Sequence, residues 1–559
     1  MDTSDSTKKH LLGSNIAKST FREIPVEIHR EIFSHVIDRR SYPGVNEMPM
    51  VLCRVCSIWR SIALFMPELW TRFAIIVGND VPFHKEFSTS ALKRYLNTFA
   101  ERSGDLSLDI MLGFEREDAT SDDPEGTAYE QQFHDLARFL GSWPHNKRIR
   151  DLCIVSPCAR YLLAVLRIPP GSFERLENVT ILGCHEPYGV CGHQLVMGVM
   201  MDDMPGEGHD DIIDDNIRTF VFAPRLRTIT FEQTLHLGYD ATLEPETWDP
   251  DEENTNRWGV FVTHLQTGIL EYSGFDDILF HCNTIQKAFF QINEDRPRDG
   301  IQVLHADTYE ALEELALEYT MRTQLRENVI FGPLGIDCLQ FLHRTHFPNL
   351  YRLQLILSGR QVVGRSDEAE PIFRIWPDRL DALSSSFPNL QEFALIFTWD
   401  LPTSDILALL SHFRGITTLK LLLCTRDYMS IIEFLTLSGV AATTAADCLP
   451  YLTCLWLDIA DEPHEDHPMS AEQRAELFTD MVFSRRYPLD GSSANLKTVK
   501  LFVPEDDLNL KSFGKEVETI FDAAMDSDGL DFKLDFSTLW PKPQDQWFQR
   551  SHWEQDYFI

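Results

Sequence analysis

A short apolar pattern recurs along most of this chain and limits what the chain can fold into. Each copy has an apolar residue, two variable residues, a second apolar residue, one variable residue and a third apolar residue. Nine clear copies begin at Ile149, Leu176, Leu226, Leu312, Leu350, Leu390, Ile416, Leu452 and Leu496. Weaker copies cover Leu265–Leu270 and Ile285–Phe290. Because strand side chains alternate between two faces, copies stacked side by side would bury a continuous apolar column.

The pattern resembles the strand segment of leucine-rich repeats. Its start-to-start spacing, weaker copies included, runs from 20 to 50 residues, whereas regular repeats of this type need about 20–29. We therefore predict an α/β fold, an irregular leucine-rich-repeat-like solenoid whose motif strands form one mostly parallel sheet. Helices or loops should cover the outer face of that sheet. The alternative is that such hexamers arise by chance in an unrelated α/β protein.

Two amphipathic stretches precede the repeats. In the first, apolar residues recur at helical spacing over Ile24–Ile37, and Pro25 suits a first helical turn. Tyr42–Gly44 breaks the pattern, and a second helical stripe covers Val51–Ala63. Two short helices cannot bury this much apolar side chain between themselves. We expect them either to pack on the following domain or to bind a partner.

These stretches resemble the F-box. The similar segments are, in order, Ile24-Pro25-Val26-Glu27-Ile28, Ile32-Phe33 and Val55-Cys56-Ser57-Ile58-Trp59-Arg60-Ser61-Ile62-Ala63. The continuation Pro67-Glu68-Leu69-Trp70 resembles the F-box-like proteins of mushroom-forming fungi. The resemblance implies a Skp-type adaptor of a cullin-based, SCF-type ubiquitin ligase as partner. It implies that the adaptor-binding residues are Ile24, Pro25, Ile28, Ile32, Val55, Cys56 and Trp59.

The chain divides by pattern into four expected segments. Residues 1–20 are expected to be disordered, and 21–70 form the F-box-like helical module. The solenoid is expected over 71–530. The tail 531–559 is rich in aromatic residues and is predicted to cap the repeats, since terminal repeats need a cover.

The motif register also predicts a surface for a target protein. The second and third apolar residues of each copy should be buried, and the residues beside them, Gln354 included, should point outward. The predicted target-binding residues are Arg352, Glu392, Lys420, Trp456, Asp458, Lys500 and Phe502. Aromatic rings beside charges are typical of protein-binding hot spots. The alternative is that insertions or the aromatic tail cover these rings.

The charge of the chain excludes several kinds of partner. A formal net charge of −36 argues against nucleic acid and against anionic membranes. The start of the chain has no secretory signal pattern, and no apolar run reaches the ~20 residues of a membrane helix. The 11 scattered cysteines are typical of reduced thiols in an intracellular protein of cytoplasm or nucleus.

No motif for catalysis stands out. Gly359–Ser366 resembles a phosphate-binding loop, but Arg365 replaces the required lysine. Cys53 and Cys56 lack a second pair at zinc spacing and should pack in the core. One cluster, Cys184, His185, Cys191 and His193, stays open as a metal site. We predict a non-enzymatic ligase receptor without cofactor or metal. The alternatives are a leucine-rich-repeat scaffold without ligase association and an enzyme with an unrecognised site.

Overall fold

A computed structural model describes a large part of the chain. The described residues are 24–36, 42, 48–78, 88–115, 124–156, 165, 168–169, 171–183, 223–231, 262–270, 279, 283–293, 308–321, 336–337, 339, 345–359, 373–375, 380, 383, 385–396, 401–422, 428–437, 449–458, 469–487, 496–502, 508–528 and 533–537. The chain forms two compact units, unit 1 (Met1–Phe261) and unit 2 (Val262–Ile559).

Unit 1 begins with helices and continues as a parallel sheet. Its helical elements are α2 (Val26–Val36), α3 (Met50–Val55), α4 (Ser57–Leu64), the 3-10 helix η1 (Pro67–Trp70), α5 (Thr89–Arg102), α6 (Pro124–Ser142) and the 3-10 helix η2 (Asn146–Arg148). Its strands are β1 (Arg72–Gly78), β2 (Leu108–Glu115), β3 (Ile149–Ser156), β4 (Asn178–Gly183) and β5 (Thr228–Phe231). Each strand pairs in parallel with the next one along the chain.

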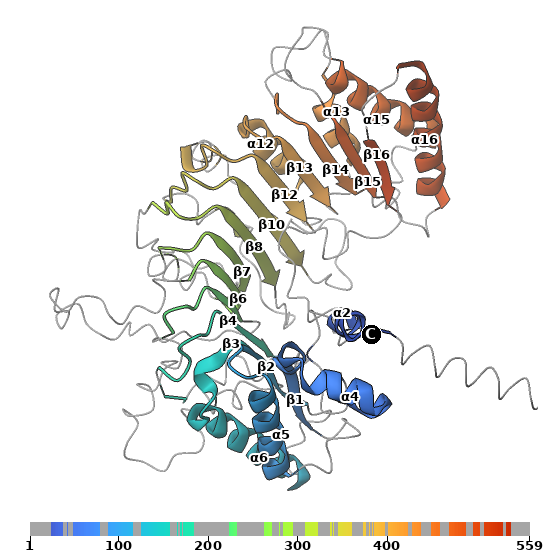
Figure 1. Ribbon diagram of the computed structural model, residues 1–559. Helices are drawn as coiled ribbons and strands as arrows, with labels where there is room; N and C mark the ends of the chain where they lie inside the picture. Colours follow the sequence, from blue (N-terminus) through green and yellow to red (C-terminus); the bar gives the residue numbers. More distant parts are fainter. Residues whose placement is uncertain are drawn as a thin grey trace, which may run out of the picture. The chain divides into compact units, whose positions relative to one another are not determined.

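Unit 2 is also built on a parallel sheet, but it begins with strands, and its helices follow later in the chain (Figure 1). Its strands are β6 (His264–Leu270), β7 (Lys287–Asn293), β8 (Glu314–Met321), β10 (Arg352–Gly359), β12 (Glu392–Ile396), β13 (Thr418–Leu422), β14 (Cys454–Asp458), β15 (Thr498–Phe502) and β16 (Lys533–Ser537). They pair in parallel in this order. A separate parallel pair joins β9 (Ile336–Asp337) and β11 (Phe373–Arg374). The helices of unit 2 are α12 (Thr403–His412), α13 (Tyr428–Leu435), α15 (Ala471–Arg486) and α16 (Leu508–Asp528).

The motif explains why these segments are strands. The second apolar residue of each copy occupies one register position, so that Leu315, Leu353 and Phe393 lie side by side on β8, β10 and β12. All three side chains are fully buried. The predicted α/β fold with parallel motif strands is confirmed within each unit. Each unit also has strands that no motif copy predicts, namely β1 and β2 in unit 1 and β9, β11 and β16 in unit 2.

The first apolar residue of each copy lies in the turn before the strand. Leu350 and Leu390 are buried there. Successive turns join through backbone hydrogen bonds. The amide of Gln391 donates to the carbonyl of Tyr351 at 2.9 Å, and the amide of Thr417 donates to the carbonyl of Gln391 at 2.8 Å. The parallel pairing therefore starts in the turns, before the strands themselves.

The predictions for the two ends of the chain fall mostly outside the described residues. Residues 1–20 lie there, as do Trp540, Trp547, Trp553, Tyr557 and Phe558 of the tail. The described part of that tail is β16, which extends the sheet of unit 2 by one strand. Within the described residues, no helix combines the length and the apolarity needed to cross a membrane.

A buried arginine connects the helices of unit 2 to its strands. Arg485 of α15 is fully buried. Its Nε donates to the carbonyl of Leu435 at the end of α13, and its guanidinium also donates to the carbonyl of Leu449 at 3.2 Å. Leu449 has a left-handed backbone (φ 51°) just before β14. The arginine thus ties the end of α13 to the turn before β14 through two buried hydrogen bonds.

We predict that Arg485→Met lowers the free energy of unfolding by about 2–4 kcal/mol, because it removes two buried hydrogen bonds that join α13, α15 and the turn before β14. Arg414→Met is the matched control, since Arg414 is exposed, and it should change stability by less than about 0.5 kcal/mol. Urea unfolding of both variants measures the difference. Equal stability of the two variants would contradict the structural role of Arg485.

Candidate functional site

The first helices of unit 1 carry a concentration of exposed apolar side chains. Twelve large hydrophobic side chains are exposed among the described residues, and eight of them lie between Val26 and Phe65. We call these eight the N-terminal apolar set: Val26, Ile28, Ile32, Val51, Val55, Ile58, Leu64 and Phe65. Phe65 is the most exposed, at 79%. Such a concentration typically marks a surface that binds another molecule.

Helix α2 has two apolar sides. His29 and Phe33 are buried, whereas Ile28 and Ile32 are 50% and 42% exposed. Residues four apart share a helix face, so each pair forms its own side. The Phe33 ring meets Trp59 of α4 edge-on, with 5.0 Å between ring centroids. One side of α2 therefore builds the core of the helical module, and the other side is left outward.

A tryptophan fixes the N-terminal helices α2–α4 to the rest of unit 1. Trp70 is fully buried, and its Nε1 donates to the carbonyl of Ala63 at 2.8 Å. Its ring packs on Phe99 of α5 at 5.0 Å between centroids, and the Arg102 guanidinium lies 4.2 Å from its ring centroid. The expectation that these helices pack on the following domain is thus met on one side.

The structure places the predicted adaptor-binding residues in different environments. Pro25, Ile28, Ile32, Val55 and Cys56 are exposed, and Ile24 and Trp59 are half-buried. The Trp59 ring packs against Phe33 and so also has a structural role. The prediction missed Val26, Val51, Ile58, Leu64 and Phe65 of the apolar set. Phe65 lies two residues beyond the second apolar stripe and two residues before Pro67, a signal that the F-box pattern does not include.

The second predicted helix is two helices. The backbone of Cys56 is extended (φ −159°, ψ 171°), which separates α3 from α4. Its sulfur accepts the N–H of Trp59 at 3.4 Å and so caps α4. The expectation that both cysteines pack in the core is wrong for Cys56, which is exposed, and correct for Cys53, which is buried. Capping needs the Cys56 side chain beside the helix start.

Trp456 and Phe502 lie on one side of the unit 2 sheet, as the register predicts. Their ring centroids are 6.0 Å apart. The Nζ atoms of Lys420 and Lys500 lie 3.8 Å and 4.6 Å from the Trp456 ring centroid. Lys420, Trp456 and Lys500 occupy the same register position on β13, β14 and β15. The indole is therefore flanked by two ammonium groups, a favourable electrostatic arrangement.

The predicted exposure of this face is wrong for Gln354, Lys420 and Phe502, which are buried. Phe502 is 2% exposed and Lys420 is 4% exposed, whereas Trp456 and Lys500 are half-buried. The physical reason is that this second face of the sheet carries an apolar cluster of its own. The cluster contains Phe289, Ala316, Ile356, Ala394, Ile396, Leu422 and Phe502, and Trp456 packs against it. Asp458 is the last residue of β14, opposite Phe502.

Two other predicted target-binding residues are paired within the sheet. Arg352 bonds Glu314 at 2.8 Å and Glu392 at 2.7 Å. Lys287 pairs with Glu314 at 2.5 Å. These residues occupy the first register position of four neighbouring strands, with alternating charge. Arg352 and Glu392 are half-buried and join neighbouring strands.

Gln354 is a buried polar residue on the face of the sheet that carries this apolar cluster. It is fully buried in the middle of β10, and neither its Nε2 nor its Oε1 has a hydrogen-bond partner among the described residues. Its register neighbours are Ala316 and Ala394. A buried polar group without a partner costs about 1–3 kcal/mol. Native proteins rarely retain such a group unless water or a ligand completes it.

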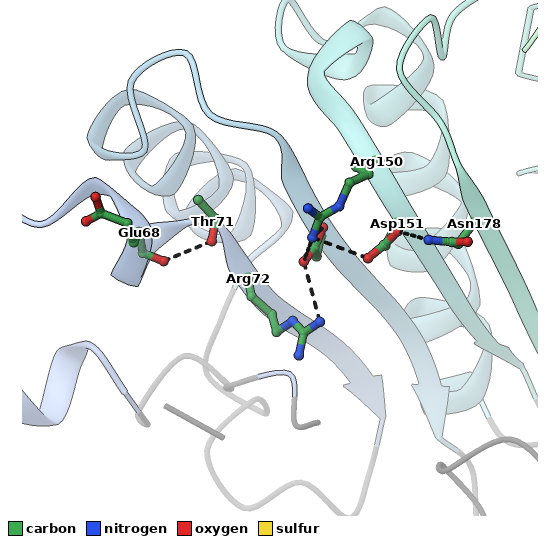
Figure 2. A network of polar contacts seen from close by, with 7 residues as sticks. Glu68, Thr71, Arg72, Arg150, Asp151 and Asn178 are labelled. Atoms are coloured by element: carbon green, nitrogen blue, oxygen red, sulfur yellow. Dashed lines mark hydrogen bonds and ion pairs between the residues drawn. The ribbon is translucent and has the colours of Figure 1, made fainter. Parts of the chain in front are cut away.

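Unit 1 has a denser polar network at the start of its strands. Figure 2 shows Arg72 and Arg150 converging on one carboxylate from two sides. That carboxylate is Asp109, which accepts from Arg150 at 2.7 Å and lies 3.5 Å from Arg72. Asp151 lies 3.5 Å from Arg150 and accepts a hydrogen bond from Asn178. Tyr42, which is buried, stacks on the Arg72 guanidinium at 5.0 Å.

Asp109 of unit 1 and Glu314 of unit 2 are both buried carboxylates, and their pKa values shift in opposite directions. Burial raises the pKa of Asp109 to about 6, the Asp151 carboxylate adds to the increase, and Arg150 and Arg72 only oppose it. Burial would also raise the pKa of Glu314. There the hydrogen bonds from Lys287 and Tyr351, with the charge of Arg352, outweigh burial and lower the pKa. Burial thus prevails at Asp109, where the Asp151 carboxylate adds to it, whereas the surrounding donors prevail at Glu314.

The candidate metal cluster Cys184, His185, Cys191 and His193 lies outside the described residues. Where residues are described, no group of three or more His, Cys, Asp and Glu side chains is arranged to hold a metal ion.

Comparison with known proteins adds no relative. No protein-family model matches the chain, and a search of curated proteins finds no match.

We predict opposite pH dependences for the two carboxylates. A raised pKa means that the folded state binds the proton more tightly, so ionised Asp109 should reduce stability as pH rises from about 4 to about 6. Glu314 has a lowered pKa, so its contribution should be present above about pH 4.5 and be lost as pH falls.

The measurement is the free energy of urea unfolding of wild type, Asp109→Asn and Glu314→Gln, at pH values from below about 4.5 up to about 6. Relative to Asp109→Asn, wild type should lose stability with rising pH. Relative to Glu314→Gln, it should gain stability. Two difference curves of the same slope would contradict the assignment.

Proposed function

We propose that this chain is the substrate-receptor subunit of a cullin-based ubiquitin ligase. Its N-terminal helices bind a Skp-type adaptor, and its repeat-like region binds a target protein. The single observation that carries the proposal is the outward side of α2 and its neighbours. The exposed apolar residues there include Ile28, Ile32 and Val55, which the F-box resemblance assigns to adaptor binding.

The chemistry of this surface suits a protein rather than a lipid or a nucleic acid. Isoleucine and valine on rigid helices supply desolvated area at low cost in side-chain entropy. Fully burying each would contribute about 1.5–3 kcal/mol before the costs of association. The net charge of −36 opposes anionic membranes and phosphate backbones. The expected location is the cytoplasm or the nucleus.

The repeat-like region gives the proposed receptor its second surface. Parallel strands in constant register present side chains in rows, which suits recognition of an extended partner. The half-buried Trp456 and Lys500 are the residues of the predicted set that best fit contact with a target. The proposal includes no catalytic group and no cofactor, since ubiquitin transfer would be carried out by other subunits.

A second candidate function is a leucine-rich-repeat scaffold without ligase association. The packing of Trp70 on Phe99 favours it, because the helices then act as an N-terminal cover of the sheet. A cover needs only its inner side to be apolar. The exposed outer side of α2 is not required for that role, which is why we rank the receptor first.

We predict that Ile28→Asp with Val55→Asp abolishes co-purification of a Skp-type adaptor, reducing affinity at least about thirtyfold. Both side chains are half exposed or more, so the fold should tolerate the change. Adaptor binding is measured by pull-down of co-expressed adaptor. Thermal melting of the same preparations, followed by circular dichroism, checks that the variant is folded.

The matched control is Tyr451→Asp with Tyr487→Asp in unit 2, where the two side chains are 54% and 47% exposed. It introduces the same charges at similar exposure and should retain the adaptor. If wild type retains no adaptor, or if both double variants retain it equally, the ligase assignment is wrong.

A further inference from the structure

The turns that lead into the motif strands share one backbone geometry but differ in one exposed side chain. In four of them the leucine that opens the motif copy donates its amide hydrogen to the carbonyl three residues earlier, at 3.0–3.4 Å; these leucines are Leu176, Leu226, Leu350 and Leu390. The exposed residue directly before the leucine is an arginine in unit 1 (Arg175, Arg225) and an asparagine in unit 2 (Asn349, Asn389). The same backbone position therefore carries two kinds of side chain.

The asparagines of unit 2 serve the fold. Asn349 Nδ2 donates to the carbonyl of Glu310, and Asn389 Nδ2 donates to the carbonyl of Pro348, both at 2.7 Å. Each bond links one turn to the turn before it and so adds to the stability of the stacked turns. Linkage between turns therefore accounts for an asparagine at this position.

The arginines of unit 1 do not replace these bonds. Within the described residues, Arg225 has no side-chain hydrogen bond and no ion pair. Arg175 donates to the carbonyl of Asp105 at 3.3 Å and forms no ion pair with any described residue. The backbone closes both turns without either guanidinium. The fold therefore gives Arg225 no role and gives Arg175 one long hydrogen bond.

A third arginine occupies the same position one strand earlier. The pairing of β3 with β4 and of β4 with β5 puts Arg148, Arg175 and Arg225 in one register row. Neighbouring strands lie about 4.8 Å apart, and like charges at neighbouring positions repel. Burial lowers the pKa of Arg148, Asp105 opposes this, and the charge of Arg175 adds to the decrease. The row thus concentrates positive charge in a chain whose net charge is −36.

Only one end of this row is used by the fold. The Arg148 guanidinium donates to the carbonyl of Leu106 and to the hydroxyl of Ser103, both at 2.7 Å. The exposed carboxylate of Glu174, next to Arg175 in the chain, is paired with Lys147. The accessible positive charge therefore lies on the turns before β4 and β5.

Guanidinium groups on neighbouring turns favour a partner with several carboxylates. Each group offers a planar pair of N–H donors that matches a carboxylate. The net charge of −36 repels a polyanion such as nucleic acid over most of the surface. That repulsion is screened beyond about 8 Å at physiological salt, so a short acidic segment meets mainly the local positive charge. The chemistry therefore favours a protein segment over a nucleic acid.

We propose that the turns leading into β4 and β5 bind an acidic segment of a partner protein, with its carboxylates on Arg175 and Arg225. The inference rests on the proposed function only in assigning that segment to the target of the ligase. Binding of the segment needs no adaptor, so the two can fail separately.

The experiment uses the full chain and fluorescent pools of terminally blocked peptides of about eight residues, which span roughly 26 Å when extended and so cover both turns. The pools are random except for two central positions, two residues apart, that are both fixed as Glu, Gln or Lys. At low salt, anisotropy should show the Glu pool binding about tenfold more tightly than the Gln pool. Raising the salt to about 1 M should abolish this preference, because the Debye length falls to about 3 Å.

The deciding variant is Arg175→Glu with Arg225→Glu. It should reverse the preference, so that the Lys pool binds more tightly than the Glu pool. The matched control is Arg414→Glu with Lys497→Glu, which makes the same change of charge at exposed turn residues of unit 2. Both double variants have the same net charge, and the control should keep the preference for Glu.

A second measurement separates binding from a role in the fold. Arg225→Ala should leave the melting midpoint unchanged, because the side chain has no partner among the described residues. Asn389→Ala, at the equivalent position of a unit 2 turn, should lower the midpoint, because the bond to the Pro348 carbonyl is lost.

Four outcomes would overturn the proposal. Equal loss of the Glu preference in both charge-reversal variants would show a general effect of net charge. A lower midpoint for Arg225→Ala would assign that arginine to the fold. A Glu preference that arises only after the acidic residues of Asp202–Asp215 are changed to amides would show that the chain's own segment occupies the row. Adaptor co-purification without any Glu preference would remove this site and leave the ligase assignment intact, whereas a Glu preference without adaptor would do the reverse.

Discussion

Side chains of the motif stack in constant register across parallel strands, and the rest of the structure depends on that stacking. Leu315, Leu353 and Phe393 lie side by side and are fully buried. A slip of one residue would turn every side chain of a strand to the opposite face, so that Arg352 would replace Leu353 in the core. Backbone hydrogen bonds in the preceding turns, such as Gln391 to Tyr351, hold the same register before each strand begins.

Constant register also decides what happens on the opposite face. At the first strand position it aligns Lys287, Glu314, Arg352 and Glu392 into alternating charges, and a carboxylate with three donors around it keeps a low pKa. In unit 1 the register pairs Asp109 with Asp151, and burial together with this second carboxylate raises the pKa of Asp109 despite two arginines. Register pairing thus gives opposite pKa shifts at the two carboxylates, depending on burial and on the groups that it brings beside them.

The N-terminal helices show how one short segment can both fold and remain available for binding. The inner side of α2 packs through Phe33 on Trp59, and Trp70 attaches the helices to α5. These packing contacts come from the inner side of the helices. The outer side, with Ile28 and Ile32, is exposed at no structural gain to the isolated chain. In the proposed receptor, an adaptor offsets the cost of this exposure.

The sequence by itself determined the motif strands and their parallel pairing within each unit, because a local pattern of period two dictates which side chains are buried. It also marked Ile28, Ile32 and Val55, which are exposed in the structure. It could not determine that Phe502 is buried, that Cys56 caps a helix, or that Arg485 bonds carbonyls near Leu435 and Leu449. Those outcomes depend on contacts between segments far apart in the chain or on the local backbone path. A local pattern specifies a side chain's face, whereas only the tertiary structure decides what lies against that face.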